Sequence, residues 1–233
     1  MTRRALLLSA LTLAATYACD STHARRPVDS PIIPPRTTVE FKTLYGTNCA
    51  GCHGPSGEGG VALGLGNPIY LAIASDATLR RVTANGVPGT AMPAFAQGAG
   101  GSLTSSQIDV IVSGIRDRWG RSNLQRGPQP PPYAAPGPGD ASRGARAYAR
   151  YCVSCHGVAG RGGSRAGSIV DVAYLGLVSE QSLRTTMIAG RPDIGHPDWR
   201  GYVADEPMSS KDVSDVDAWL ASQRARSSTQ PYQ

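Results

Sequence analysis

Apolar residues recur with helical spacing in two stretches, one near residue 110 and one near residue 216. In each stretch they lie at i, i+3 and then i+7 or nearby, which places them on one face of a helix. The members are Ile108, Ile111 and Ile115 in the first stretch, and Val213, Val216 and Leu220 in the second. Each helix is expected to begin just after a hydroxyl residue, near Thr104 and Ser209 respectively. The apolar faces are predicted to be buried core.

Two further helices are expected in each half of the chain. One leads into each of two cysteine motifs, with Asp140 or Ser142 as the start of the second copy. A shorter one covers residues 76–84 and has its partner over residues 179–189. The fold is therefore expected to be mostly α.

The two halves are repeats of one another. Their landmarks are displaced by 103 to 105 residues, and the pairs are Tyr45 and Tyr148, Leu79 and Leu183, Gly86 and Gly190, and Ile108 and Val213. So constant an offset predicts two tandem copies of one helical domain, over residues 38–123 and 140–225. Residues 124–139, which include the run RGPQPPPYAAPGPG, form a Pro-rich linker that can be neither helix nor central strand. It is expected to be an extended, semi-rigid spacer.

The N-terminal residues indicate export. Arg3 and Arg4 precede a short apolar stretch, so residues 1–18 are expected to be a signal peptide. Cys19, directly after Ala18, resembles the lipidated cysteine of bacterial lipoproteins; the alternative is an ordinary signal peptide with a stray thiol. Residues 19–37 would then be a tether from the lipid anchor, and residues 226–233 are expected to be a disordered tail.

The candidate chemistry lies in the sequence C-x-x-C-H, which occurs as CAGCH and as CVSCH. In an exported protein this spacing is typical of covalent c-type haem attachment. The predicted attachment residues are Cys49, Cys52 and His53 for one haem and Cys152, Cys155 and His156 for the other. A zinc site would leave the two histidines without a reason. A redox dithiol would need neither the histidines nor two copies.

Composition fits two small haem domains. Hydrophobic residues make up 40% of the chain, and there are 28 glycines and 18 prolines, so the macrocycle is expected to supply part of the apolar core. The formal net charge is +6, and removal of the two leader arginines and addition of haem propionates would cancel much of it. Charge is therefore weak support for an anionic partner. Scattered arginines and 6% aromatic residues give no indication of nucleic-acid binding.

Each half resembles a class I cytochrome c domain, with a tyrosine, then C-x-x-C-H, then a ligand followed by proline, then a closing helix. The whole chain is similar to bacterial dihaem cytochrome c lipoproteins. The resemblance implies two covalently bound haem c groups and, by analogy with some relatives, a membrane-tethered subunit beside a quinol-oxidising complex. Phe41 departs from the pattern, because the family often keeps a glycine there for close helix crossing, as the second half does with Gly144.

The family's second iron ligand falls on Met92 in the first half, within GTAMPAF. A displacement of 104 residues from Met92 leads to His196, which is also followed by proline. We therefore expect methionine–histidine coordination at the first haem and bis-histidine coordination at the second. Met208 is the alternative ligand in the second half, although its position at the foot of the last helix favours core packing. Met187 is expected to be core.

Two haems with both axial positions filled predict an electron carrier with no catalytic residues. The second haem is expected to have the lower midpoint potential, since imidazole stabilises ferric iron relative to a thioether. Expected partners are redox proteins, among them a quinol-oxidising complex or a terminal oxidase, at the outer face of a bacterial membrane. The alternatives are a dihaem peroxidase-like enzyme and the haem subunit of a dehydrogenase or oxidase.

Overall fold

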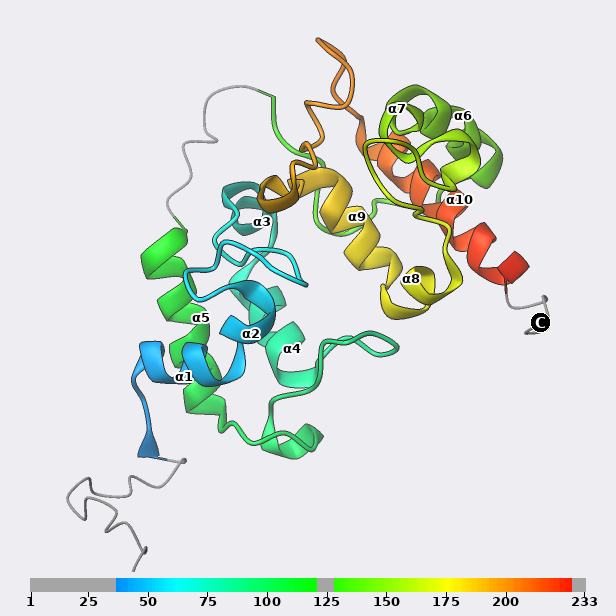
Figure 1. Ribbon diagram of the computed structural model, residues 1–233. Helices are drawn as coiled ribbons and strands as arrows, with labels where there is room; N and C mark the ends of the chain where they lie inside the picture. Colours follow the sequence, from blue (N-terminus) through cyan, green and yellow to red (C-terminus); the bar gives the residue numbers. More distant parts are fainter. Residues whose placement is uncertain (1–36, 121–127, 228–233) are drawn as a thin grey trace, which may run out of the picture. The chain divides into compact units, whose positions relative to one another are not determined.

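Helices account for the regular structure of both halves of the chain (Figure 1). The computed structural model describes residues 37–120 and 128–227, which we call the first and second segments. The helices of the first segment are α1 (Phe41–Asn48), α2 (Ala50–His53), α3 (Pro68–Ile73), α4 (Asp76–Asn85) and α5 (Ser105–Trp119). Those of the second are α6 (Ala141–Tyr151), α7 (Val153–His156), α8 (Val172–Leu177), α9 (Glu180–Ala189) and α10 (Ser210–Ser227). These two segments contain isolated β-bridges but no strand, so the predicted mostly α fold is confirmed.

Side-chain caps explain where most of these helices begin. Thr104 and Gln107 form a reciprocal capping box at the start of α5, and the Asp140 side chain accepts a bond from the Arg143 N–H at the start of α6. These starts agree with the predicted ones. Four helices escaped prediction: the one-turn helices α2 and α7, and the helices α3 and α8, although Asn67 and Asp171 cap the last two in the same way.

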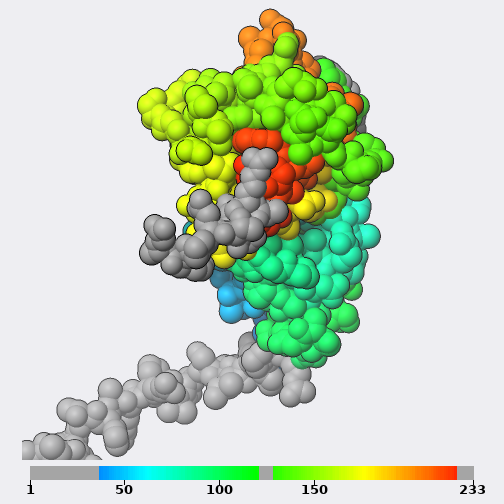
Figure 2. Space-filling model, turned by 90° about the vertical axis from the view of Figure 1, so that its right-hand side faces the viewer, coloured from blue at the N-terminus to red at the C-terminus, as the bar shows by residue number. Residues whose placement is uncertain are grey.

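The predicted apolar stripes form the core of both segments. Ile108, Ile111 and Ile115 of α5 are each at most 2% exposed, and Val213 and Val216 of α10 are at most 1% exposed. In the first segment α5 packs against α4 and α1, and in the second α10 packs against α6 and α9 (Figure 1). In the space-filling view of Figure 2 the red atoms of α10 are bordered by green and yellow atoms of the same segment.

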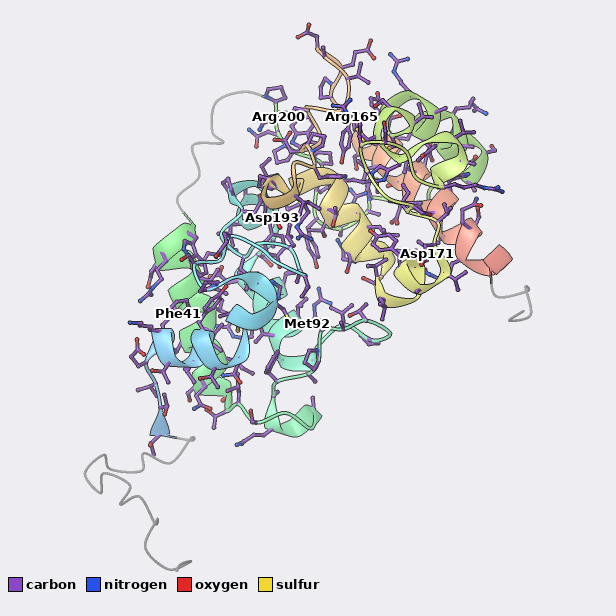
Figure 3. The ribbon with its side chains drawn as sticks, in the orientation of Figure 1. Phe41, Met92, Arg165, Asp171, Asp193 and Arg200 are labelled. Atoms are coloured by element: carbon purple, nitrogen blue, oxygen red, sulfur yellow. The ribbon has the colours of Figure 1, made fainter. Side chains whose placement is uncertain are left out.

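The crossing of the first and last helices explains the departure at Phe41. A Cβ atom built on Gly114 of α5 would lie 2.0 Å from Phe41 Cδ2, so the ring occupies the space that a side chain at 114 would need. The second segment reverses the sizes: Gly144 is on α6, and a Cβ there would lie 2.7 Å from Trp219 Cβ of α10. Each crossing therefore pairs one aromatic residue with one glycine. Figure 3 labels Phe41 at the start of α1, beside α5.

Residues 128–139 of the predicted linker are neither helix nor strand, as expected. They are bound to α9, because the buried side chain of Arg184 on this helix donates hydrogen bonds to the carbonyls of Pro132 and Tyr133 at 2.8 and 3.0 Å. The rest of the linker prediction, residues 124–127, lies outside the described residues. At the C-terminal end α10 continues through Ser227, because its helical hydrogen bonding extends two residues into the segment predicted to be a disordered tail. That correction concerns residues 226–227 alone.

The two segments also contact one another, within a compact unit that covers residues 36–233. The Asn67 side chain at the start of α3 donates a buried hydrogen bond of 2.9 Å to the carbonyl of Ala189 at the end of α9. Among the helices within residues 37–120 and 128–227, none combines the length and the hydropathy of a transmembrane span. Residues 1–18 and Cys19, on which the export and lipid-anchor predictions depend, lie outside the described residues.

Candidate haem sites

Both C-x-x-C-H motifs adopt the same local structure. A helix ends at the first cysteine of the motif, and a second, one-turn helix carries the other residues, as α1 and α2 or as α6 and α7. A tyrosine four residues before each motif forms a hydrogen bond with the residue that follows the motif. The Tyr45 hydroxyl donates to the Gly54 carbonyl at 2.8 Å, and the Tyr148 hydroxyl donates to the Gly157 carbonyl at 2.5 Å. The two motifs are thus presented by equivalent scaffolds.

The four motif cysteines are free thiols. Burial raises the pKa of Cys49 to about 11 and that of Cys152 to about 12, so both remain protonated at neutral pH. A pair of unoxidised thiols at this spacing is the donor set that covalent haem attachment requires. No cluster of three or more metal-binding side chains of the His, Cys, Asp or Glu type occurs within residues 37–120 and 128–227.

Each motif histidine is oriented by a backbone carbonyl. Nδ1 of His53 lies 2.6 Å from the Leu63 carbonyl, and Nδ1 of His156 lies 2.9 Å from that of Gly167. A carbonyl partner fixes the proton on Nδ1 and leaves Nε2 as the free lone pair for a metal, the arrangement common to ligating histidines. These carbonyls escaped sequence reasoning, because a backbone acceptor has no residue signature.

The loops that carry Met92 and His196 are equivalent in three dimensions. The Val87 N–H donates to the Met92 carbonyl at 3.0 Å, and the Arg191 N–H donates to the His196 carbonyl at 2.9 Å. Each loop passes over a glycine with positive φ that ends the preceding helix: Gly86 lies against Met92 and Pro93, and Gly190 lies against His196 and Pro197. Met92 and His196, which a displacement of 104 residues aligns in the sequence, thus accept equivalent backbone hydrogen bonds in the two segments. Figure 3 shows Met92 on the loop after α4.

The second segment brings its two candidate ligands together. The ring centroids of His156 and His196 lie 6.2 Å apart, with their planes tilted by 54°. Two metal–nitrogen bonds of about 2 Å, together with the depth of both rings, require a centroid separation of roughly 6 to 6.5 Å. The tilt imposes no obstacle, because each ring can rotate about its own bond to the metal. Nδ1 of His196 is buried and has no hydrogen-bond partner in the described segments. The residues present therefore fit a haem iron between the two rings.

Burial lowers the pKa of His53 and of His196, and the positive charge of Arg191 lowers both further. The charge of the neighbouring His156 also lowers the pKa of His196. Both rings are consequently neutral at pH 7, which is the protonation state that binds iron. Tyr202 packs edge-on against His196 at a centroid distance of 5.6 Å and donates through its hydroxyl to the Met187 carbonyl at 3.0 Å. This tyrosine was not anticipated from the sequence.

The other two methionines of the second segment lie in the core. Met208 is fully buried, and its N–H donates to the Trp199 carbonyl at 2.8 Å. The equivalent bond in the first segment joins Leu103 to the Phe95 carbonyl at 2.7 Å, so Met208 occupies the place of a core leucine. Met187 is 7% exposed. This packing supports His196 over Met208 as the candidate ligand.

Both segments of the chain match one family of known proteins. The family model described as cytochrome c oxidase, cbb3-type, subunit III matches residues 37–113 and again residues 139–220. A cbb3-type cytochrome c oxidase subunit FixP from Bradyrhizobium sp. (strain ORS 278) is 29% identical over 170 residues, which are 69% of this chain and 53% of that protein. A cytochrome bc1 complex cytochrome c subunit from Mycobacterium leprae (strain TN) is 28% identical over 150 residues, 64% of this chain and 50% of that protein.

The chain thus spans about half the length of these curated relatives. Among solved structures, a chain of the reducing HAO-like protein complex of Kuenenia stuttgartiensis is similar with a TM-score of 0.46 and 19% identity, over 82% of this chain and 98% of that one. The family model covers well over half of the sequence and includes both C-x-x-C-H motifs. The chain belongs to the cytochrome c family described as cytochrome c oxidase, cbb3-type, subunit III.

Proposed function

We propose that this chain is a dihaem electron carrier. One haem c is attached through Cys49 and Cys52 and the other through Cys152 and Cys155. The observation that carries the proposal is the repetition of the attachment scaffold: the same attachment helices, a carbonyl behind the motif histidine and a ligand loop with the same backbone hydrogen bond occur twice. A protein with one functional haem would have no reason to keep both sets.

When bound, each haem supplies an iron that alternates between the ferrous and ferric states, one electron at a time. His53 and Met92 would hold one iron, and His156 and His196 would hold the other. A thioether favours the ferrous state more than an imidazole does, so the first site has the higher potential. With two protein ligands at each iron, neither site offers an open position to a substrate, which favours a carrier over an enzyme.

The attachment sites can be tested one at a time. We expect the mature protein, produced in a host that attaches haem c, to have the mass of the chain plus two haems. The double variant Cys49→Ala/Cys52→Ala should lose one haem and keep the low-potential one, and Cys152→Ala/Cys155→Ala should keep the high-potential one. A chain that carries one haem before any substitution contradicts the proposal.

A second measurement tests the alternative function, a peroxidase-like enzyme. A six-coordinate carrier should bind no carbon monoxide after full reduction and should not consume hydrogen peroxide with a reductant. Binding of carbon monoxide by half of the haem would show that one iron has a free coordination position. That result would favour the peroxidase-like enzyme over the electron carrier.

We further propose that the carrier works at the outer face of a bacterial membrane, anchored by a lipid on Cys19, beside a terminal oxidase or a quinol-oxidising complex. The names of the two relatives, subunits of a cbb3-type oxidase and of a bc1 complex, support such partners. Cys19→Ser should move the haem protein from the membrane fraction to the soluble periplasmic fraction. Retention of the variant in the membrane would contradict the lipid anchor, and detergent extraction of the unaltered protein should co-purify its redox partner.

A further inference from the structure

Arg191 lies in the loop that carries His196, and its guanidinium donates hydrogen bonds to two partners, Asp193 and Gly60. Nε donates to Asp193 Oδ1 at 2.9 Å, and Nη2 donates to Asp193 Oδ2 at 2.6 Å. Nη2 also donates to the backbone carbonyl of Gly60 at 2.5 Å. Gly60 belongs to the other segment, in the loop that follows the first C-x-x-C-H motif. The Arg191 and Asp193 side chains are 13% and 16% exposed, so most of this ion pair is shielded from water.

Short hydrogen bonds continue from this contact to both sites. The Gly59 N–H donates to the carbonyl of His53 at 2.9 Å. On the other side, the backbones of Arg191 and His196 exchange two hydrogen bonds of 2.9 Å each. Arg191 is therefore the side chain that joins the loop of one candidate ligand to the loop of another, in a different segment.

Two neighbouring contacts hold the same surfaces together. Gly59 has a φ of +115°, and a Cβ atom there would lie 2.8 Å from the Asp193 carboxyl, so this glycine permits the close approach of the ion pair. Asn67 donates to the Ala189 carbonyl at 2.9 Å in a buried position. Figure 3 shows Asp193 on the loop after α9.

The ligand loop itself does not require an arginine. Val87 occupies the position equivalent to Arg191 and makes the same backbone hydrogen bond to its own ligand loop. Gly89 occupies the position equivalent to Asp193, and no atom lies within 4 Å of a Cβ placed there. The first segment closes its ligand loop with uncharged residues and with one of these two backbone hydrogen bonds, since the Met92 N–H donates to Thr90 Oγ1 instead. Closure of such a loop therefore does not require the Arg191–Asp193 pair.

We propose that Arg191, oriented by Asp193, joins the two haem sites: it fastens the His196 loop to the attachment loop of the first haem, and its charge raises the midpoint potentials of both haems. The inference rests on the proposed dihaem function. A fixed positive charge near two irons disfavours the ferric state of each, because the ferric state carries the extra positive charge.

Three variants separate the effect of the Arg191 hydrogen bonds from the effect of its positive charge. Arg191→Ala removes both, and Arg191→Lys keeps the charge but cannot bind Asp193 through a planar fork while it reaches Gly60. Arg200→Ala is the matched control, since Arg200 forms the same kind of ion pair with Asp198 two residues away and has no hydrogen bond to the first segment. Each variant is compared with the unaltered haem protein by hydrogen exchange followed by mass spectrometry and by potentiometric titration.

In Arg191→Ala we expect roughly tenfold faster exchange in peptides around residues 54–66, as for the loss of a hydrogen bond from a charged donor, and lower midpoint potentials for both haems. Arg191→Lys should show the faster exchange but retain the potentials, and Arg200→Ala should change neither. Unaltered exchange in Arg191→Ala would overturn the fastening role. A shift of one potential alone, or of none, would overturn the joint charge effect. If the unaltered protein carried one haem, the proposed function would fail on its mass, whereas the exchange measurement would still test the contact with Gly60.

Discussion

The rings of His156 and His196 lie with their centroids 6.2 Å apart, although 40 residues separate them in the sequence. This is the spacing of two imidazoles that share one metal ion. The first segment has Met92 in the place of His196, on a loop with the same backbone hydrogen bond. The two sites therefore share a scaffold and differ in one candidate ligand, and the difference has measurable consequences.

Replacement of His196 by methionine should raise the midpoint potential of the second haem. The thioether stabilises ferrous iron, and axial ligands account for much of a range of about 0.8 V, so an increase of tens to a few hundred millivolts is expected. Potentiometric titration of His196→Met followed by visible absorption measures it. The first haem, with Met92, serves as the internal reference, and a variant with both potentials unaltered would refute the assignment.

Met208 should have no part in iron coordination. Because it is fully buried in the place of a core leucine, Met208→Leu is expected to cost less than about 1.5 kcal/mol of unfolding free energy and to leave the haem spectra unaltered. Near-infrared absorption of the oxidised protein is the test, since methionine–iron coordination has its own charge-transfer band there. Loss of such a band from the second haem in Met208→Leu would identify Met208 as the ligand in place of His196.

Gly114→Ala should destabilise the first segment, because the new Cβ would lie 2.0 Å from the Phe41 ring. Overpacking of this kind costs about 1–3 kcal/mol. Removal of the ring should relieve it, so the double variant Phe41→Ala/Gly114→Ala is expected to be less destabilised than the sum of its single variants. Urea unfolding of all four proteins provides the double-mutant cycle.

The second crossing provides a control for this rescue. A Cβ on Gly144 would lie 1.9 Å from the backbone carbonyl of Asp215, as well as near Trp219. Since a backbone atom cannot be shortened, Trp219→Leu should fail to rescue Gly144→Ala. Rescue at Gly144, or strict additivity at Gly114, would contradict the packing described for the two crossings.

Asp217 on α10 should make the protein less stable as the pH rises. Burial raises its pKa to about 7 and nearby Glu180 adds to the effect, while Arg184 and Arg224 oppose it. Oδ1 of this carboxyl is buried without a hydrogen-bond partner in the described segments. Below about pH 4 the group is protonated in both the folded and the unfolded state. Between about pH 4 and 7 only the folded state keeps the proton, so stability decreases with pH and the full cost is present above pH 7.

Asp217→Asn should remove this dependence. We expect the variant and the unaltered protein to have similar unfolding free energies near pH 4, and the variant to be more stable at pH 8 by on the order of 2–4 kcal/mol. Urea unfolding at both pH values measures the gap. Asp109→Asn, at an exposed ion pair with Arg80, is the control and should show a difference within about 1 kcal/mol. A gap for Asp217→Asn that is the same at both pH values would show that the carboxyl is ionised in the folded protein.

Much of the fold could be predicted because its signals are local. The apolar stripes of α5 and α10 and their hydroxyl caps placed both helices, and the constant displacement between landmarks related the two halves. The short helices α3 and α8 were missed for lack of periodicity over six residues, although Asn67 with Pro68, and Asp171, were usable cap signals. The place of Phe41 could not be deduced, since its partner Gly114 lies 73 residues away in the sequence.

The candidate sites divide in the same way. The attachment cysteines and histidines follow from spacing, and the pair Met92 and His196 from the repeat. What holds them does not follow, because the carbonyls of Leu63 and Gly167 are backbone groups that any residue carries. Arg191 gave no signal either, as its contact with Gly60 joins positions 131 residues apart.

Potentiometric titration of the unaltered, fully haem-loaded protein decides whether the chain carries two haems with different axial ligands. The titration is followed in the near-infrared, where methionine-ligated and bis-histidine haems absorb differently. We expect two one-electron components of equal amplitude, and the component with the lower potential should have the bis-histidine spectrum. A single component, two components with the same spectrum, or a bis-histidine haem at the higher potential would contradict this expectation.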